Sequence, residues 1–174
     1  GGVVHIRPDG TQRLIAQALD TRFGAAQDEA DRFTKGTLPN GLAFDGDGSI
    51  LISNFGTDRL ERMTRNGDTT VVLDTIDGTP IGKVNFVLRD SKGRIWLTIS
   101  TRIVNWMAAI SPNRSDGYVA VIDDDGARIV ADGLRFTNEI RFDAREEWLY
   151  VVETTGRCIT RLRIGKDAQV LARE

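Results

Sequence analysis

Residues 40–45 read Asn-Gly-Leu-Ala-Phe-Asp, and the same spacing of asparagine and aspartate returns as Asn-Phe-Val-Leu-Arg-Asp at 85–90 and Asn-Glu-Ile-Arg-Phe-Asp at 138–143. The asparagines are 45 and 53 residues apart (85 − 40 and 138 − 85). Each segment leads through a polar turn into a short apolar run, at 50–52, 95–97 and 149–152. Two short apolar runs on either side of a polar turn are typical of antiparallel strands, so each segment predicts strand, turn, strand.

A second motif, a hairpin around a polar turn, recurs four times. Its turns are Pro8-Asp9-Gly10, Asn66-Gly67, Asp124-Asp125-Gly126 and Gly165-Lys166-Asp167. Asn-Gly and Asp-Gly favour hairpins because both turn positions tolerate a positive φ. Joined, the two motifs form a unit of four short antiparallel strands, whose length of about 45 residues is the period of a β-propeller blade.

The repeat therefore predicts an all-β chain with a single propeller domain over residues 1–174. It comprises about three and a half four-stranded antiparallel blades, as in a fragment or an incomplete ring. The predicted units are a half blade at 1–19 and blades at 37–75, 82–134 and 135–174.

Two stretches interrupt the repeat. Residues 25–33 could form one or two helical turns. Residues 101–116 separate the second and third strands of the middle blade, a connection that emerges on the face where the innermost strands begin, so we expect it to lie over the central mouth as a lid. The insertion carries three apolar side chains, Trp106, Met107 and Ile110. A plug against neighbouring blades is the alternative role for them.

Composition excludes several classes of function. Lys and Arg number 23 against 25 Asp and Glu, a formal net charge of −2, which provides no basic field for nucleic acid and no polybasic anchor for a membrane. A single cysteine, Cys158, excludes an internal disulfide or a cysteine-built zinc site, and a single histidine, His5, excludes sites that need several imidazoles. The sequence shows no signal peptide, so a cytoplasmic location is expected.

The repeated asparagines Asn40, Asn85 and Asn138 begin the predicted innermost strands. Equal positions in successive blades converge on the axis, so they should form part of one polar ring. An asparagine carbonyl oxygen is a suitable ligand for Ca²⁺, Mg²⁺ or Mn²⁺, and the amide can donate to a substrate. Capping of strand starts or turns is the equally weighted alternative.

These motifs resemble the senescence-marker-protein/gluconolactonase/luciferin-regenerating-enzyme family. The resemblance rests on Leu-Pro-Asn-Gly-Leu-Ala-Phe-Asp at 38–45, on Lys83-Val84-Asn85 followed by residues 90–98, and on Thr137-Asn138 followed by residues 149–154. It covers nearly the whole chain. It implies a six-bladed propeller, many of whose members are lactonases with a divalent metal on the channel axis.

Carried over by position, Asn138 corresponds to a metal-ligand asparagine. Asn85 corresponds to an asparagine that contacts substrate, a metal-bound water or the metal, and Lys83 stands where some members carry a substrate-binding arginine. Asn40, the third member of the ring, is expected to contact substrate. Glu139 departs from the family, which more often has glycine there; it either points away along the strand or adds a carboxylate near the metal, and we favour the former.

Two family carboxylates have no counterpart in the sequence. They are a glutamate ligand that would lie before Gly1 and an aspartate, ligand and general base, that would lie beyond Glu174. The catalytic base is therefore unassigned, and we expect the isolated chain to be inactive.

The resemblance implies metal-dependent hydrolysis of a lactone, with Ca²⁺ as the first candidate and Zn²⁺, Mg²⁺ or Mn²⁺ as alternatives. A non-catalytic interaction module and a strictosidine-synthase-like propeller are the competing functions. Terminal blades should also expose apolar faces, covered by further segments or by self-association.

Overall fold

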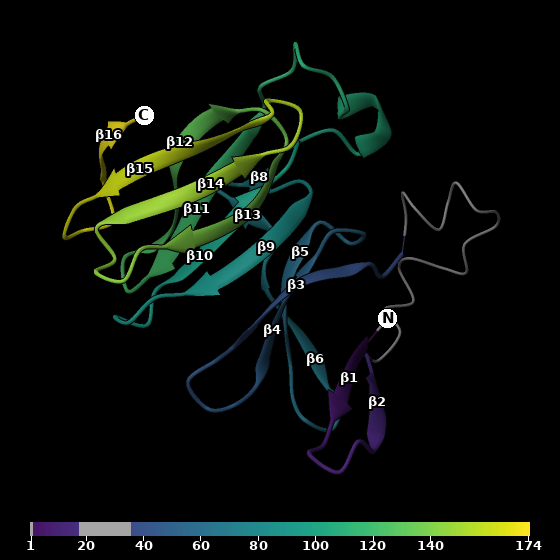
Figure 1. Cartoon of the computed structure of the whole chain (residues 1–174). Helices are drawn as coiled ribbons and strands as arrows, with labels where there is room; N and C mark the ends of the chain where they lie inside the picture. The colour runs from purple at the N-terminus through teal and green to yellow at the C-terminus, as the bar shows by residue number, and fades with distance from the viewer. Residues whose placement is uncertain (1, 18–35) are drawn as a thin grey trace.

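The computed structural model describes residues 2–17 and 36–174, which form an all-β structure (Figure 1). The helical turns expected at 25–33 lie outside the described residues. Three antiparallel sheets of four strands each follow one another along the chain, and every strand pairs with its neighbour in sequence. The first sheet contains β3 (Pro39–Phe44), β4 (Ile50–Asn54), β5 (Arg59–Met63) and β6 (Thr69–Leu73).

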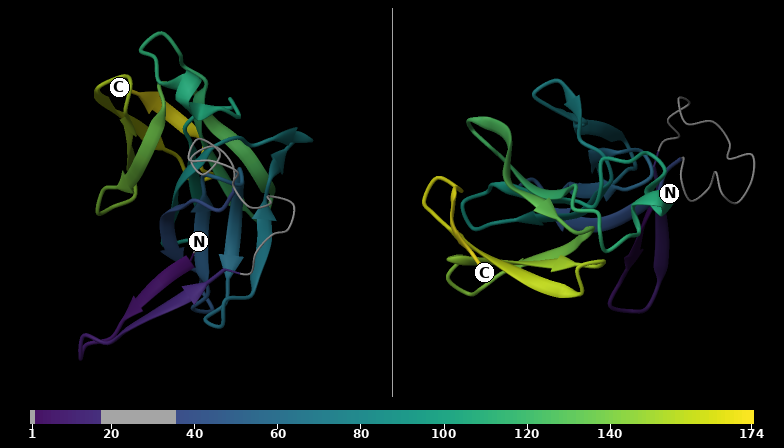
Figure 2. Two further views of the ribbon diagram at one scale, coloured as in Figure 1. Left: turned by 90° about the vertical axis from the view of Figure 1, so that its right-hand side faces the viewer. Right: turned by 90° about the horizontal axis from the view of Figure 1, so that it is seen from above.

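The other two large sheets repeat this order. The second contains β9 (Val84–Arg89), β10 (Ile95–Ile99), β11 (Gly117–Asp123) and β12 (Gly126–Leu134). The third contains β13 (Thr137–Phe142), β14 (Trp148–Glu153), β15 (Cys158–Ile164) and β16 (Val170–Arg173). Strand β9 contacts both β3 and β13, so the first strands of the three sheets lie next to one another (Figure 2).

Two smaller hairpins complete the strands. One joins β1 (Gly2–Ile6) to β2 (Gln12–Ala16), as the first predicted hairpin requires. The other, β7 (Thr75–Ile76) with β8 (Thr79–Pro80), was not predicted. It turns through Asp77 and Gly78, both at positive φ, but only two residues on each side pair, too few to give a strand pattern in the sequence.

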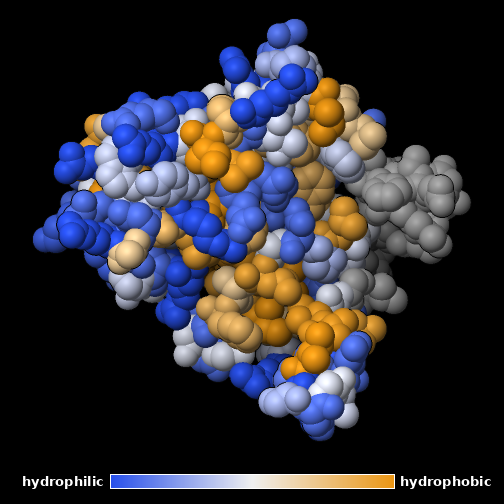
Figure 3. All heavy atoms as spheres, viewed as in Figure 1, coloured by the Kyte–Doolittle hydropathy of each residue, from blue (hydrophilic) through white to orange (hydrophobic). Residues whose placement is uncertain are grey.

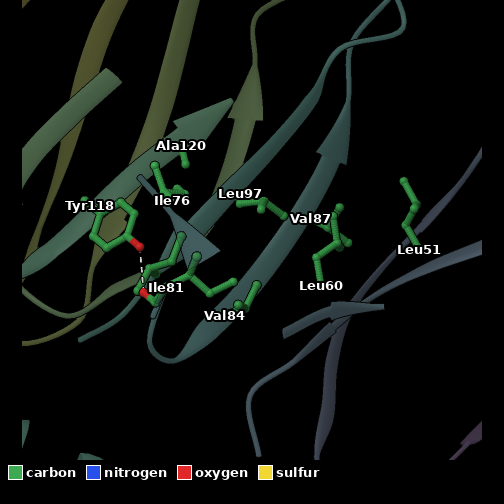
Figure 4. Packing of buried hydrophobic residues seen from close by; sticks show 10 residues of the cluster. Leu51, Leu60, Ile76, Ile81, Val84, Val87, Leu97, Tyr118 and Ala120 are labelled. Atoms are coloured by element: carbon green, nitrogen blue, oxygen red, sulfur yellow. Dashed lines mark hydrogen bonds between the residues drawn. The ribbon is translucent and has the colours of Figure 1, made fainter. Parts of the chain in front are cut away.

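The core lies between the sheets, because each strand sends alternate side chains to opposite faces of its sheet. Leu97 and Ile99 of β10 point toward the first sheet, where Leu51 and Leu60 pack against Val84 and Val87 (Figure 4). Trp96 points toward the third sheet and meets Phe142 edge to face at 5.2 Å between ring centroids. The expected role of Trp96 in packing between repeats is thereby confirmed.

The repeated aspartate holds the turn after each inner strand. The carbonyl oxygen of Asp45 accepts from Gly48 and that of Asp90 accepts from Gly93, both at 3.0 Å. In the third sheet Asp143 accepts from Glu146, which also has a positive φ, 54°, without being glycine. The turn geometry is thus repeated even where the glycine is not.

Apolar side chains are exposed on the side of the molecule where β1 lies. Five of them are Val4, Ile6, Leu14, Leu42 and Phe44. A groove of about 450 Å³ runs between β1 and the first sheet, and Figure 3 shows an apolar area in the lower part of the view, where β1 to β4 lie in Figure 1. Among the described residues, no helix is long and apolar enough to cross a membrane.

Candidate functional site

Each of the three inner strands begins with a one-residue bulge, and the repeated asparagine lies in it. In the second sheet Thr98 pairs with Phe86 while Ile99 pairs with Val84, which leaves Asn85 as the extra residue. The first sheet places two residues, 40 and 41, opposite one, and the third does the same with 138 and 139. Bulges re-aim side chains and are frequent beside active sites. The asparagines therefore leave the regular alternation at one common end of the sheets.

Two of the asparagines touch directly. Asn40 donates through Nδ2 to Oδ1 of Asn85 at 2.9 Å, which joins the first sheet to the second. The approach is close because the next residue is Gly41: a Cβ there would lie only 2.8 Å from Cα of Phe86. A larger residue at position 41 would push the two inner strands apart.

Asn85 is also tied to the third sheet. Its Nδ2 donates to Oγ of Ser100 at 2.8 Å, and Ser100 donates to the carbonyl oxygen of Thr137 at 2.6 Å. Thr137 immediately precedes Asn138. The asparagine of the middle sheet is therefore hydrogen-bonded, directly or through one hydroxyl, to the starts of both neighbouring inner strands.

A second set of hydroxyls joins the main chains of successive sheets. Ser53 accepts from the amide of Gly41 at 2.7 Å and donates to the carbonyl oxygen of Asn85 at 2.7 Å. Thr98, 45 residues later, accepts from Phe86 at 3.1 Å and donates to the carbonyl oxygen of Asn138 at 2.5 Å. In the third sheet the corresponding residue is Val152, which is exposed and has no hydroxyl.

Asn138 is more exposed than Asn85. Its Nδ2 donates to Oγ1 of Thr154, in the turn after β14, at 3.3 Å. Across residues 2–17 and 36–174, no hydrogen bond reaches Oδ1 of Asn138 or Oδ1 of Asn40. The neighbouring Glu139 forms an exposed ion pair with Arg141 at 2.6 Å, which occupies its carboxylate.

Lys83 is buried, with 1% of its side chain exposed. Its ammonium lies 2.9 Å from Oδ1 of Asp58 and 5.9 Å from the ring centre of Phe55. Burial raises the pKa of the Asp58 carboxyl, although the Lys83 ammonium beside it acts in the opposite direction. The structure thus places Lys83, which directly precedes β9, in an ion pair with Asp58, and a contact of Lys83 with substrate stays a prediction.

The insertion at 101–116 packs at the same end of the sheets. Its single 3₁₀ turn, η2 (Trp106–Ala109), sets Trp106 edge to face on Phe55 at 5.5 Å and tilted on Phe136 at 6.3 Å between ring centroids. Phe136 lies two residues before Asn138. Met107, in contrast, is 57% exposed. Trp106 therefore has the packing expected of a plug, whereas Met107 does not.

The donors present suit only part of a cation site. Among the described residues no group of three His, Cys, Asp or Glu side chains could hold a metal ion. The buried carboxylates nearest the asparagine end are already used: Glu61 accepts from Asn54 at 2.9 Å, and Glu153 accepts from Thr160 at 2.5 Å. The two carbonyl oxygens left without hydrogen bonds, on Asn40 and Asn138, fit a hard cation in kind but bring no charge.

Comparison with solved structures identifies the architecture. A gluconolactonase from Xanthomonas campestris matches 99% of this chain with a TM-score of 0.75 at 21% identity, and the match covers 54% of that protein. A chain of a nidogen/laminin complex matches 99% with a TM-score of 0.66 at 22% identity, over 55% of its length. The sheets are blades of a β-propeller.

The all-β propeller prediction is confirmed, and the chain spans about half the length of the six-bladed propellers that it matches. Virginiamycin B lyase from Staphylococcus aureus also shares the blades, with a TM-score of 0.63 at 15% identity over 99% of this chain and 48% of that one. No family model matches the sequence, and no curated protein matches it by sequence. The likeness to gluconolactonases is therefore one of blade structure at low identity.

Sequence reasoning missed the hydroxyls that organise this end of the blades. Ser53 and Thr98 are 45 residues apart (98 − 53), the same interval as Asn40 and Asn85, so a periodic signal was present. Asp58, the partner of Lys83, belongs to the turn between two strands of the preceding blade, and no local pattern marks it.

Proposed function

We propose that these blades form part of a metal-dependent site that hydrolyses a lactone. The observation that carries the proposal is the shared end of the three inner strands, where Asn40, Asn85 and Asn138 lie in equivalent bulges and two amide oxygens have no hydrogen bond within the described residues. The structural likeness to gluconolactonases supports the choice of substrate class.

In this proposal Asn138 and Asn85 hold the cation through their carbonyl oxygens, with Ca²⁺ as the preferred ion. Oδ1 of Asn85 already accepts from Asn40, so it would bind the cation through its second lone pair. Asn40 and Lys83 contact the substrate. A bound divalent ion would polarise the lactone carbonyl and lower the pKa of a water molecule. The two amides contribute no charge, so the carboxylates and the general base have to come from outside the described residues.

The test is Ca²⁺ titration by calorimetry, combined with lactone hydrolysis by the whole gene product before and after chelation. We expect hydrolysis that chelation abolishes and that Ca²⁺ restores. Asn138→Ala should weaken Ca²⁺ binding at least about tenfold, as the loss of a ligand or its support does. Asn66→Ala, in an exposed turn, is the matched control. A gene product that binds no divalent ion and opens no lactone would refute the proposal.

A non-catalytic interaction module is the second candidate. It is favoured by the match to a chain of the nidogen/laminin complex and by the lack, among the described residues, of a carboxylate cluster for a metal. Absence of hydrolysis together with stable capture of a protein partner by the gene product would support it.

A further inference from the structure

We propose that Ser100 is a positioning residue that decides which end of the Asn85 carboxamide faces the polar ring. Ser100 is wholly buried between the second and third blades. Its Oγ lies 2.8 Å from Nδ2 of Asn85 and 2.6 Å from the carbonyl oxygen of Thr137. It is the one side chain through which Asn85 reaches the third blade within the described residues.

The orientation follows from counting hydrogens. A hydroxyl has one proton to donate, and the main-chain carbonyl of Thr137 can only accept. Ser100 must therefore give its proton to Thr137, and toward Asn85 it can only accept. The amide nitrogen of Asn85 then has to face Ser100, which turns Oδ1 of Asn85 toward Asn40.

The same constraint passes on to the first blade. Because Oδ1 of Asn85 accepts, Asn40 must present its own Nδ2, as the 2.9 Å contact shows. Oδ1 of Asn40 is thereby left without a hydrogen bond among the described residues. The three hydrogen bonds thus point in one direction: Asn40 donates to Asn85, and Asn85 donates to Ser100. Ser100 in turn donates to the carbonyl oxygen of Thr137, the residue before Asn138.

This direction matters for what the ring can bind. With Ser100 in place, the ring offers carbonyl oxygens, which attract a cation or the proton of a hydroxyl. If the Asn85 amide were reversed, Asn40 would reverse with it and the ring would offer amide protons, which repel a cation. The assignment to cation binding rests on the proposed function; the orientation of Asn85 does not.

The test compares Ser100→Ala with Ser100→Cys, which replaces the hydroxyl by a somewhat larger thiol that hydrogen-bonds weakly. Tyr118→Phe is the control, because the Tyr118 hydroxyl is also buried and bonds only a main-chain carbonyl oxygen, that of Ile81, at 2.6 Å. The first measurement is hydrogen exchange of the Asn85 side-chain amide protons by NMR. We expect exchange at least about tenfold faster in both Ser100 variants and unchanged exchange in Tyr118→Phe.

The second measurement is Ca²⁺ affinity, which should fall at least about tenfold in both Ser100 variants and little in the control. Unchanged Asn85 exchange in Ser100→Ala would overturn the proposal, and so would a Ser100→Cys variant that matches the wild type, because packing alone would then orient the amide. If the unaltered protein binds no Ca²⁺ but the Asn85 exchange responds as expected, the proposed function fails while the positioning role of Ser100 stands.

Discussion

Nδ2 of Asn40 lies 2.9 Å from Oδ1 of Asn85, so two residues 45 positions apart join neighbouring blades side chain to side chain. Both lie in bulges and both begin an inner strand. The two asparagines can touch because equivalent positions of adjacent blades lie at the same end of the sheets. Asn138 extends the set through Ser100 and Thr137 rather than by a contact of its own.

The buried pair of Lys83 and Asp58 should be strongly coupled. Removing one partner leaves the other charge in a poorly solvated site, which costs about 3–5 kcal/mol for fully buried pairs. Because Asp58 is 29% exposed, we expect a smaller loss, about 2 kcal/mol, for Lys83→Met or Asp58→Asn. The double variant should lose less than the sum in urea unfolding.

Glu139→Gln is the control for this cycle. It breaks an exposed ion pair with Arg141 and should cost less than about 1 kcal/mol. Strictly additive losses for Lys83→Met and Asp58→Asn would show that the two charges do not stabilise each other.

Trp106 should anchor the insertion at 101–116. Its contacts with Phe55 and Phe136 are each worth about 0.5–1.5 kcal/mol beyond area burial, so Trp106→Ala should lower the free energy of unfolding by about 2 kcal/mol. Met107→Ala, at an exposed position one residue later, should change it by less than about 0.5 kcal/mol. Equal effects would mean that the aromatic contacts do not hold the insertion.

A separate measurement addresses the lid. Shortening 101–116 to a tight turn also removes Trp106, so it should lower the free energy of unfolding by at least the loss of about 2 kcal/mol expected for Trp106→Ala. If the insertion also acts as a lid, KM for a substrate should change in addition. A lowered unfolding temperature with unchanged kinetics would assign the segment to the plug role alone.

Asp90 should make stability fall in acid. Burial alone would raise the pKa of its carboxyl, but hydrogen bonds from Trp96 and Arg94, together with the arginine charge, lower it below the ordinary value of 3.8. A lowered folded-state pKa stabilises the native protein above pH 3.8, and this contribution is lost as the pH falls from there through the folded-state value.

Asp90→Asn should therefore be less stable than the wild type near about pH 7, and the difference should shrink toward about pH 3. Urea unfolding at a series of pH values measures both effects. Asp124→Asn removes the same charge from an exposed turn and serves as the control. A difference that stays constant in acid would contradict the role of the Asp90 carboxylate.

Thr98 should stabilise the contact between the second and third blades. Thr98→Val keeps the shape but leaves the amide of Phe86 and the carbonyl of Asn138 without their hydroxyl, which should cost about 1–3 kcal/mol. Val152→Thr places a hydroxyl at the corresponding exposed position. No blade that follows is described there to bond it, so the change in stability should be less than about 0.5 kcal/mol. Comparable effects of the two changes, measured by urea unfolding, would rule out the inter-blade role.

The strands and turns could be predicted because their signals are local. Apolar runs and polar turns, Asn-Gly or Asp-Gly among them, specify the strands and hairpins within each blade, and the same signals return in every blade. The turn before β14 shows the limit of such local signals. Glu146 has a positive φ at the position of Gly48 and Gly93, and its carboxylate accepts from Ser91 of the previous blade at 2.6 Å. A contact with another blade substitutes there for the residue type that the pattern requires.

The candidate site was only partly predictable for the same reason. That Asn40, Asn85 and Asn138 share one end follows from the repeat. Their amide orientations depend on Ser100 and on the main chain of Thr137, which belong to other strands and blades. The sequence order of Lys83 and Asn85 likewise suggested a shared site, whereas the carboxylate that Lys83 meets comes from a turn of the preceding blade.

Because of the bulge, each inner strand has one residue more than its partner strand at the repeated asparagine. Without Asn85, Phe86 would follow Val84 directly, and the two would still find their partners Thr98 and Ile99 on β10. Deletion of Asn85, unlike its substitution, would thus remove the bulge and leave continuous pairing between β9 and β10, with loss of the Asn85 amide and its hydrogen bonds to other blades. Ligand chemistry at this end of the molecule can therefore be gained or lost one codon at a time, while the sheet beneath it continues to pair.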